Sequence, residues 1–295
     1  MTTTTTPATP ELLARWAATP PPVGPETDHE RQRWLSRLAD ADLRARVFFT
    51  HDDDTVHALL GLHRFRDGRY RLGRIRTASP PDERAAALIH AAIARARDEG
   101  ARLVGMRLPV EHATPPILRA VTASGGRFDG GRIEFRRDLR ELPREAPHGP
   151  LRWREARDRD QTAALYVRTS EGSDDGLEPG EDPRETVDAW RTGPLRCAVH
   201  TGSLDGVPVA LVCAHADTDG PPTWSGLAWM GLVPEARGRG LGHAVHAHGL
   251  SLLRRLGGTV YHGGTSLDNA PMRACFARQD VPELCRFDRL RWDLP

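Results

Sequence analysis

The sequence predicts a mixed α/β protein that contains two tandem domains of the same kind. Three observations support this fold class: the length of 295 residues, a proline-rich break near the middle, and a similar order of strands and helices on both sides of the break. At about 150 residues per domain, the length favours two domains. The break is Leu142–Pro150, which holds three prolines and one glycine and is typical of an interdomain linker.

The ends of the two halves repeat each other. The first half ends in ATPPILRAVTASGG and IEFRRDL, and the second in DNAPMRACFARQD and DRLRWDL. At a constant offset of 155 positions, the matched pairs are Thr114 with Asn269, Pro116 with Pro271 and Asp138 with Asp293. Repetition over the length of a domain indicates a duplicated unit. We therefore expect a disordered N-terminal segment over 1–25, a first domain over 26–141, a linker over 142–150 and a second domain over 151–295.

In the first half, the threonine- and proline-rich start, Met1–Pro10, predicts a disordered tail. Apolar segments then predict strands over 46–50, 55–65, 70–76, 102–108 and 131–138. Ser79 and Pro80 are expected to open a helix that ends at Gly100. The residues that share one face of this helix are Leu88, Ile89, Ala92, Ile93 and Ala96. A shorter helix is expected over 115–123.

The second half predicts the same order of elements. Helices are expected over 158–169, 240–256 and 270–278, and strands over 196–201, 208–216, 223–233, 259–265 and 284–293. The first two of these strands flank the turn Leu204-Asp205-Gly206, which is typical of a hairpin. Antiparallel strands followed by alternating strands and helices predict a mixed α/β domain.

All 41 basic side chains are arginine, and the chain contains no lysine. This excludes a Schiff-base lysine, a phosphate-loop lysine and a lysine general base. Abundant Ala, Gly, Pro and Arg are typical of a GC-rich genome, which accounts for the bias. Residues 1–147 carry 24 Arg against 20 acids, and residues 148–295 carry 17 Arg against 20 acids. Neither half has the basic excess of a nucleic-acid-binding protein, so no nucleic-acid partner is expected.

The chain is expected to work in the cytoplasm, without a membrane partner. It has no apolar run of about 18 residues and no secretory signal pattern at its start. The four cysteines, Cys197, Cys213, Cys275 and Cys285, are widely spaced without a Cys-x-x-Cys pair. This spacing predicts reduced core thiols rather than a disulfide framework.

The most informative stretch is VPEARGRGLG, from Val233 to Gly242, which follows an apolar strand and leads into a helix. Gly238, Gly240 and Gly242 remove side chains where a ligand could touch the backbone. The amides from Arg239 onward would be the unpaired donors of the helix start, which favours an anion such as a pyrophosphate. The stretch lacks the Gly-Lys-Ser/Thr end of a phosphate loop, and its G-x-G-x-G spacing differs from the dinucleotide fingerprint G-x-G-x-x-G.

This stretch resembles the acetyl-CoA pyrophosphate loop of the GNAT acyltransferases, whose core is Gln/Arg-x-x-Gly-x-Gly/Ala. An asparagine after the next strand, in SLDNAPMRACF, matches a later motif of that family. The resemblance implies acetyl-CoA as co-substrate, no metal, and an opening between two central parallel strands. The residues it implies for binding are Leu232, Val233, Arg237, Gly238, Arg239, Gly240, Leu241, Gly242 and Asn269. Leu232 and Val233 would pair with the pantetheine arm through their backbone.

Two departures from the family pattern concern catalysis. Phe276 occupies the position of the tyrosine that protonates the leaving thiolate in many members, and Asp280-Val281 replaces the following Gly-Phe/Tyr. The proton-donating role is therefore vacant or filled elsewhere. In the first half the loop position reads ASPPDERA, without glycine, so that half is expected to be a degenerate copy that keeps the fold without binding CoA. Tandem acyltransferases such as mycothiol synthase have a similar arrangement.

The acceptor side carries an acidic segment from Glu171 to Asp188, with eight acids and one arginine. Such a field attracts a cationic amine, although a solvated acidic loop explains it equally well. A backbone amide near Val233 suits the oxyanion of the acyl transfer. The candidate bases are His215, Asp217, Glu171 and His262, each of which could also be an ordinary surface or strand-end residue.

His243, His246 and His248 are interpreted as a helix surface that flanks the co-substrate rather than a zinc site. Trp224 and Trp229 are expected to pack in the core. The function predicted is an acyl-CoA-dependent N-acyltransferase, with acetyl-CoA as donor and an amine of a small molecule or peptide as acceptor. The alternative is a non-catalytic CoA-binding sensor or interaction protein. The protein is expected to act as a monomer or homodimer.

Overall fold

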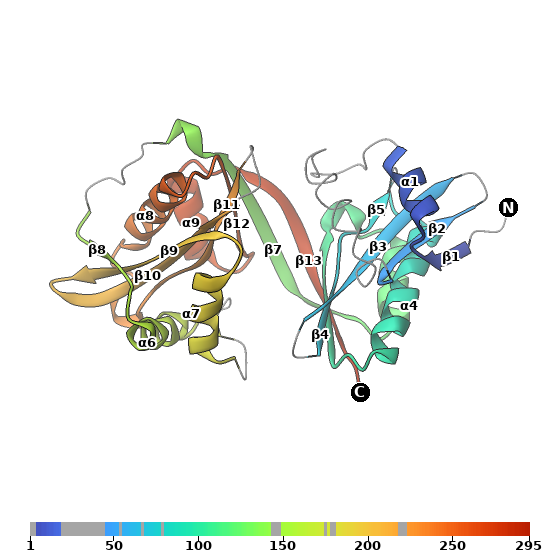
Figure 1. Ribbon diagram of the computed structural model, residues 1–295, viewed down its shortest axis with the longest axis horizontal. Helices are drawn as coiled ribbons and strands as arrows, with labels where there is room; N and C mark the ends of the chain where they lie inside the picture. Colours follow the sequence, from blue (N-terminus) through green and yellow to red (C-terminus); the bar gives the residue numbers. More distant parts are fainter. Residues whose placement is uncertain are drawn as a thin grey trace. The chain divides into compact units, whose positions relative to one another are not determined.

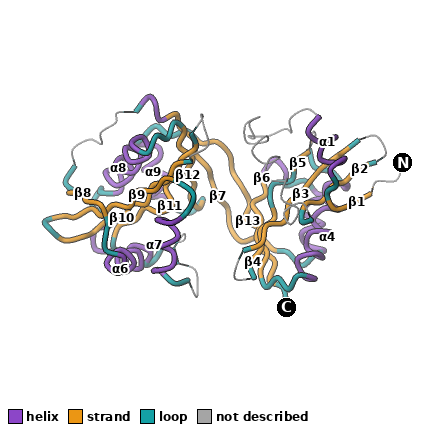
Figure 2. Tube along the Cα trace, viewed as in Figure 1, coloured by secondary structure: helices purple, strands orange, loops and turns teal. Residues whose placement is uncertain are grey.

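The computed structural model describes residues 4–18, 45–52, 55–65, 68–77, 80–142, 149–173, 176–177, 181–217 and 223–295. The chain forms two compact units (Figures 1 and 2). The first comprises Met1–Arg132 with Cys285–Pro295, and the second comprises Ile133–Leu284. Each unit contains a sheet with helices packed on it, so the predicted mixed α/β class is confirmed. No helix among the described residues is long and apolar enough to cross a membrane.

In the first unit the sheet has the strand order β1-β2-β3-β4-β6-β13, and β5 pairs with β3. The strands are β1 (Thr4–Pro7), β2 (Val47–His51), β3 (Val56–Arg64), β4 (Arg69–Leu72), β5 (Arg76–Thr77) and β6 (Leu103–Pro109). The helices are α1 (Pro10–Ala18), α4 (Glu83–Asp98), the 3₁₀ turn η1 (Val110–His112) and α5 (Pro115–Ala123). Helix α4 packs on β2 and β3, and α5 packs on α4 (Figure 1).

The described part of the N-terminal segment forms a strand and a helix, so the prediction of a disordered tail is wrong for it. Thr4–Pro7 forms β1, which pairs antiparallel with β2, and α1 follows. Threonine has a high strand propensity, and β2 offers an unpaired edge. Leu12 and Trp16 then bury their side chains against Phe49 and Leu59. The remainder of the predicted segment 1–25 lies outside the described residues.

Helix α4 buries the predicted face but begins three residues later than the predicted proline start. Asp82 is its N-cap, and its carboxylate accepts hydrogen bonds from the amides of Arg84 and Ala85 at 3.0 and 3.2 Å. The apolar face formed by Leu88, Ile89, Ala92, Ile93 and Ala96 is fully buried. Ser79 lies outside the described residues. A carboxylate at the N-terminus of a helix satisfies its free amides and complements the helix dipole.

In the second unit the sheet has the strand order β7-β12-β11-β10-β9-β8. The strands are β8 (Arg152–Glu155), β9 (Arg196–Leu204), β10 (Val207–Ala216), β11 (Trp224–Leu232) and β12 (Val260–Ser266), together with the end of β7 (Arg127–Asp138). The helices are η2 (Leu139–Glu141), α6 (Arg159–Ser170), α7 (Pro183–Thr192), η3 (Pro234–Ala236), α8 (Gly242–Arg255) and α9 (Ala270–Arg278). In Figure 1, α8 and α9 lie on one face of this sheet and α6 and α7 on the other.

The predicted hairpin of the second half is confirmed. Strands β9 and β10 pair antiparallel around Asp205 and Gly206, whose φ angles are 52° and 84°. Two successive residues with positive φ form the tight turn that matches the twist of a two-stranded ribbon, and Asp-Gly is a preferred sequence for it.

Two strands pass from one compact unit to the other, which differs from the predicted domain limits at 141 and 151. Strand β7 begins in the first unit, and its residues from Ile133 onward belong to the second. Strand β13 (Glu283–Asp293) begins in the second unit, but Phe287–Asp293 pairs antiparallel with β6 of the first. Each unit is therefore completed by a strand from the other half of the sequence. The predicted linker lies mostly outside the described residues.

Residues from the end of β7 are part of the core of the second unit. The ring of Phe135 stacks on Phe276 of α9, with 3.9 Å between ring centroids. Ile133 and Leu139 are 1% and 0% exposed, and the Leu139 amide donates to the Thr259 carbonyl at 2.9 Å. The first half of the sequence thus supplies packing that the second unit needs.

Candidate functional site

The two central parallel strands of the second unit separate shortly after they begin. Strand β11 pairs with β12 only at Trp224–Val260 and Ser225–Tyr261, whereas it pairs with β10 up to its last residue, Leu232. The edge of β11 that faces β12 is therefore not paired with that strand from Gly226 to Leu232. Backbone donors and acceptors on such an edge are suited to bind an extended ligand in the manner of an added strand.

A β-bulge lies in the middle of this edge. Cys213 of β10 faces Trp229, and the next residue, Ala214, faces Leu227, so Ala228 is the extra residue on β11. The Ala228 side chain is exposed, whereas its chain neighbours Leu227 and Trp229 are half-buried and buried. Bulges bend a strand and turn its backbone groups away from the ladder, and they are common next to active sites. The bulge thus marks the position on β11 where a ligand group could meet free backbone.

The loop between β11 and α8 has a backbone that depends on glycine. Gly238 and Gly240 have φ angles of 71° and 75°, which non-glycine residues rarely adopt. A Cβ added at either position would have no atom within 4 Å, so the space beside the loop is open. Two left-handed residues within three positions turn successive amides outward, a geometry that forms an anion-binding concavity.

Helix α8 begins without a side-chain cap. Its N-cap is Leu241, which makes no capping hydrogen bond, and its first helical bond runs from the Val245 amide to the Leu241 carbonyl at 3.1 Å. The amides of the first turn, Gly242–Ala244, precede the first possible helical acceptor. They are available to an anion beside the loop, where the helix dipole adds favourable potential.

Gly242 has a structural requirement that the sequence did not reveal. A Cβ at this position would lie 3.1 Å from the Cys275 sulfur of α9, which is tighter than ordinary packing. Its glycine is therefore explained by the close approach of α8 and α9, while its amide still belongs to the open helix start.

Arg237 lies in the loop and is exposed, but its guanidinium bonds to two backbone carbonyls of the chain. Its Nε donates to the Leu232 carbonyl at 3.0 Å and its Nη2 donates to the Thr169 carbonyl of α6 at 3.1 Å. These bonds hold the loop between the end of β11 and the end of α6. They also occupy one lone pair of the Leu232 carbonyl, which was expected to contact a ligand. Arg239 is exposed beside the loop.

The Val233 amide is engaged within the sheet, whereas the prediction concerned a backbone amide near Val233. It donates to the Val209 carbonyl of β10 at 2.9 Å, and the Val233 side chain is buried. Backbone groups of successive strand residues point to opposite sides, so the amides that face β12 belong to neighbouring residues of β11. The amides on that edge of β11 therefore lie near Val233 without being engaged in the ladder with β10.

Asn269 is the N-cap of α9. Its Oδ1 accepts a hydrogen bond from the Met272 amide at 3.0 Å. This fixes the start of the helix that packs on α8, so the observed role of Asn269 is to position α9.

Three of the four candidate bases lie near the point where β11 and β12 separate. His215 faces Gly226 across the β10–β11 ladder, and a Cβ on Gly226 would lie 3.5 Å from its Nε2 and 3.0 Å from the His262 carbonyl. Asp217 is buried at the end of β10, where its amide donates to the Trp224 carbonyl. Burial lowers the pKa of His215, and the Asp217 carboxylate opposes that shift.

Glu171, the fourth candidate, lies apart from the other three. It is the exposed C-cap of α6, and a Cβ on the next residue, Gly172, would lie 3.6 Å from Arg237. It therefore belongs to the loop end of β11, whereas His215 and His262 belong to the opposite end.

The structure adds a carboxylate that the sequence did not single out. Glu134 of β7 is 7% exposed, and its Oε2 lies 3.4 Å from Nε2 of His262 on β12. Trp224 lies beside this pair, with its ring 6.0 Å from the imidazole, and the Arg136 guanidinium lies 4.8 Å above the indole. In the sequence, the buried position of Glu134 is indicated by the apolar residues on both sides of it, in the segment IEF. Its partner could not be found because β7 comes from the other half of the sequence.

The two tryptophans of β11 have different environments. Trp229 is buried as predicted, where its Nε1 donates to Thr169 Oγ1 at 3.0 Å and its ring packs edge-on against Tyr166. Trp224 is only half-buried and lies with Arg136 and His262, so the expectation of a core position is wrong for it. Alternation along β11 does not distinguish a face covered by helices from one that is partly open.

The three histidines of α8 have three separate partners. His243 contacts Gln279 at 2.9 Å and His246 contacts the Tyr261 hydroxyl at 3.2 Å. His248 contacts His200 at 3.2 Å and stacks on Trp153. Burial lowers the pKa of His246 and of His248 to about 3, which favours neutral imidazoles. Within the described residues, no three His, Cys, Asp or Glu side chains form a group that could hold a metal.

The residues that depart from the family pattern, Phe276 in α9 and Asp280-Val281 after it, have packing and backbone roles. Phe276 is 1% exposed and stacked on Phe135, so its ring is part of the core. Asp280 has a φ of 48°, the left-handed conformation that glycine favours and that aspartate tolerates better than most residues. Val281 follows with a buried side chain. Asp280 therefore supplies a left-handed residue in the turn after α9, and Val281 supplies an apolar side chain to the core.

Several acids of the predicted acidic segment have structural partners. Asp182 caps α7 through the Arg184 amide, Glu181 accepts from the Tyr166 and Thr186 hydroxyls, and Asp188 pairs with Arg159. Asp174, Asp175 and Glu178 lie outside the described residues. The negative field of the segment is thus partly neutralised by contacts within the protein.

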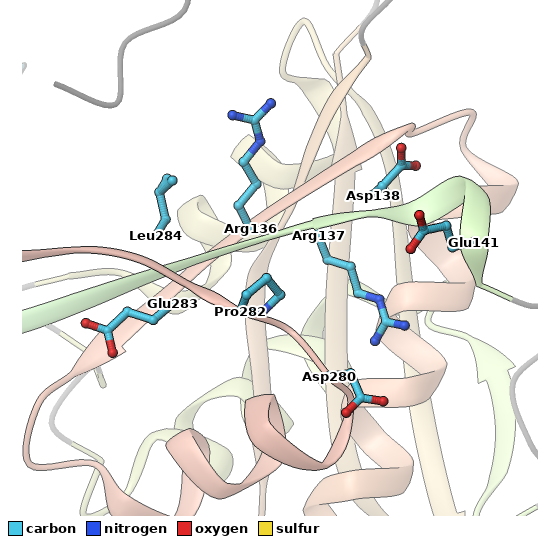
Figure 3. A pocket seen from close by; sticks show the side chains of 8 residues that line it. All are labelled: Arg136, Arg137, Asp138, Glu141, Asp280, Pro282, Glu283 and Leu284. Atoms are coloured by element: carbon cyan, nitrogen blue, oxygen red, sulfur yellow. The ribbon is translucent and has the colours of Figure 1, made fainter. Parts of the chain in front are cut away.

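A cavity of about 500 Å³ opens between the end of β7, η2 and the turn after α9. Figure 3 shows Arg137 extending toward Asp280, while Arg136 points to the opposite side of β7. Asp138, also in its lining, pairs with Arg140, which lowers the pKa of its carboxyl to about 2. This cavity does not include any residue of the β11–α8 loop.

Comparisons with known proteins agree with this geometry. Residues 155–280 match the model of the GNAT acetyltransferase family. A tandem GNAT protein from the clavulanic acid biosynthesis pathway has 16% identity and a TM-score of 0.62 over 99% of this chain and 98% of its own. A GCN5-related N-acetyltransferase from Sphaerobacter thermophilus has 15% identity and a TM-score of 0.67 over 99% and 95%. No curated protein sequence matches the chain.

The structural similarities show the fold of the chain, which is that of tandem GNAT proteins. The family match over residues 155–280 covers somewhat less than half of the chain, and it confirms the predicted resemblance to the GNAT acetyltransferase family.

Proposed function

We propose that the protein transfers an acetyl group from acetyl-CoA to an amine of a small molecule or peptide. The observation that carries the proposal is the combination of an uncapped helix start at Leu241 with the unpaired edge of β11 beside it. The glycine loop and the first turn of α8 suit a pyrophosphate, and the β11 edge suits the extended pantetheine arm. The two features adjoin each other, as the directly linked pyrophosphate and pantetheine parts of one CoA molecule require.

In this proposal the loop residues divide into two roles. Gly238, Gly240 and the amides up to Ala244 would bind the pyrophosphate, with Arg239 adding a charge-assisted contact. Arg237 would act indirectly, since its guanidinium holds the loop to Leu232 and Thr169. Asn269 would likewise position α9 beside α8.

The described residues of the first half lack both features, which supports the interpretation of this half as a copy that does not bind CoA. All four residues of β4 pair with β6, from Arg69–Leu103 to Leu72–Met106, so no edge of β4 opens toward β6. The start of α4 is already occupied by the Asp82 carboxylate. A pyrophosphate would have to displace that carboxylate and meet its negative charge. We therefore place the single CoA site in the second unit.

The pair His262 and Glu134 is our proposal for the general base. The imidazole lies where β11 and β12 separate, and its Nε2 lies 3.4 Å from the buried Glu134 carboxylate. His262 would take a proton as the amine nitrogen attacks the thioester carbonyl, and the carbon–sulfur bond would then break to release the CoA thiolate. Glu134 would orient the imidazole and stabilise its charged form, as carboxylates do in other His-based sites. Phe276 cannot protonate the thiolate, so solvent would supply that proton.

Replacing His262 should reduce turnover without reducing acetyl-CoA binding. We expect His262→Ala to lower kcat by about 100-fold, the usual contribution of a general base, with partial rescue by added imidazole. Glu134→Gln should lower kcat by about tenfold. His215→Gln is the control, because His215 lies near the same point but on β10, which β11 separates from β12, and its replacement should have a smaller effect. Loss of acetyl-CoA affinity in His262→Ala would show a structural role instead.

A non-catalytic CoA-binding protein is the second candidate function, because Phe276 removes the usual proton donor. The two functions differ in thioester cleavage. Release of free CoA from acetyl-CoA, measured against a panel of polyamines, amino acids, aminoglycosides and peptides, should occur with at least one amine if the protein is an acetyltransferase. Binding without release across the panel would favour the sensor.

The acceptor is proposed to approach past α6 and α7, where the acidic segment lies. The partners found for Asp182, Glu181 and Asp188 reduce the charge available to a cationic amine. A cationic acceptor therefore remains a proposal that the amine panel tests, by comparing polyamines with neutral amines at low and high salt.

A further inference from the structure

Two of the four cysteines lie in contact on neighbouring strands. Sγ of Cys197 on β9 and Sγ of Cys213 on β10 are 3.6 Å apart. They occupy diagonal positions of the hairpin, since Cys213 faces Val199 and Cys197 faces His215. The cysteines were expected to be reduced core thiols, and all four are free thiols, of which the hairpin brings these two into contact.

The two thiols have different environments. Cys213 is 0% exposed, whereas Cys197 is half-buried and lines a cavity of about 460 Å³ together with Arg157 and Arg191. The hydrogen bond with Cys213, assisted by the positive charge of Arg191, lowers the pKa of the Cys197 thiol against the effect of burial. The same hydrogen bond and burial raise the pKa of the Cys213 thiol. One thiol is therefore accessible and the more acidic, and the other is enclosed beside it.

We propose that Cys197 and Cys213 form a modification site for hydroperoxides. The Cys197 thiolate attacks one peroxide oxygen, the O–O bond breaks, and Cys197 becomes a sulfenic acid while the other oxygen leaves as water or an alcohol. The Cys213 sulfur then attacks the Cys197 sulfur, the S–O bond breaks, and the Cys213 proton leaves with the hydroxide as water. The dithiol loses two electrons and the peroxide gains them.

Closing this disulfide requires movement of the two strands. Diagonal residues of an antiparallel pair are typically about 7–8 Å apart at Cα, which exceeds the usual span of a disulfide. The sulfurs must also approach from 3.6 Å to bonding distance. The backbone of the oxidised hairpin must therefore move locally. We expect this movement at Cys213, because the pairing of β10 with β11 changes register between Cys213 and Ala214.

A series of contacts connects Cys213 with the loop between β11 and α8. Cys213 faces Trp229, whose Nε1 donates to Thr169 Oγ1. The Thr169 carbonyl in turn accepts from Arg237, which anchors the loop before α8. Oxidation is therefore expected to weaken acetyl-CoA binding. This consequence rests on the proposed function, whereas the oxidation itself does not.

The test uses the full-length protein, treated with hydrogen peroxide and examined by intact mass and by peptide mapping of each cysteine. We expect a loss of two hydrogen atoms, a Cys197–Cys213 disulfide and reversal by dithiothreitol. Cys213→Ala should instead retain a sulfenic acid on Cys197 that dimedone traps, and Cys197→Ser should leave Cys213 reduced. Cys285→Ser is the matched control and should still form the disulfide.

Two results would overturn the proposal. The first is reaction of Cys197 with peroxide or iodoacetamide no faster than Cys285 in the wild-type protein, where faster reaction is expected because Cys197 lines a cavity beside Arg191 and contacts a second thiol. The second is a disulfide that joins other cysteines. The coupling is tested separately: acetyl-CoA affinity should fall by about tenfold on oxidation and recover on reduction. Unchanged affinity would overturn the coupling alone, and failure of the reduced protein to bind acetyl-CoA would overturn the proposed function alone.

Discussion

Gly240→Asp is expected to abolish the thermal stabilisation that acetyl-CoA gives to the wild-type protein. At 100 times its Kd, a ligand that binds only the folded state stabilises it by about 2.7 kcal/mol, which corresponds to about 5–10 °C in Tm for a domain of this size. Gly240 has a φ of 75° in the loop before α8. Aspartate would place a negative charge where the pyrophosphate is proposed to bind, and it would strain the loop.

The control for this experiment must separate charge from backbone strain. Gly206→Asp has the same strain, because Gly206 has a φ of 84° and no atom within 4 Å of an added Cβ, but it lies in the β9–β10 turn. It should lower Tm without changing the response to acetyl-CoA. Gly240→Ala should weaken binding less than Gly240→Asp. A normal response to acetyl-CoA in Gly240→Asp would contradict the proposed site.

The elements of the fold were largely predictable from local patterns. Helix α4 shows its apolar face in the spacing of its leucines, isoleucines and alanines, and the β9–β10 hairpin is indicated by Asp205-Gly206. Helix starts were less predictable, since Ser79-Pro80 and Asp82 are both plausible signals and only packing selects between them. The edge pairing of Thr4–Pro7 was missed because composition does not reveal an available partner strand.

The site was predictable in position but less so in detail. The glycines of the loop could be recognised because positive φ angles leave a clear mark in sequence. Backbone bonds leave no such mark, so the engagement of the Val233 amide by Val209 could not be foreseen. The hydrogen bonds of Arg237 within the chain could not be predicted for the same reason, because both acceptors are backbone carbonyls.

Contacts between residues that meet only through the strand order and register of the sheet were the hardest to predict from the sequence. Glu134 meets His262 because the end of β7 joins the sheet of the second unit. Cys197 meets Cys213 because of the exact register of one hairpin, where a shift of one residue would turn the two thiols to opposite faces. Both pairs depend on which strands are neighbours and in which register, and a single sequence constrains these only weakly.

The passage of β7 into the second unit predicts that residues 151–295 alone will not fold. This fragment lacks Ile133, Phe135 and Leu139, which are nearly fully buried in the core of that unit. Losing a buried phenylalanine costs about 3–5 kcal/mol, and each aliphatic side chain adds about 1.5–3 kcal/mol. The sum, about 6–11 kcal/mol, is comparable to the whole stability of a typical domain. The fragment also leaves β13 without its partner strand β6.

The sharpest control supplies the missing strand on a separate chain. Fragments 1–142 and 143–295 contain all residues, and each carries one strand that completes the unit formed by the other. Co-expressed, they should copurify, unfold cooperatively and bind acetyl-CoA, whereas 151–295 alone should show no cooperative transition in circular dichroism. A folded 151–295 that binds acetyl-CoA would show that β7 is dispensable. Fragments that fail to associate, although each is soluble, would equally contradict completion of each unit by the other half, because strands that complete a core provide most of the affinity between such fragments.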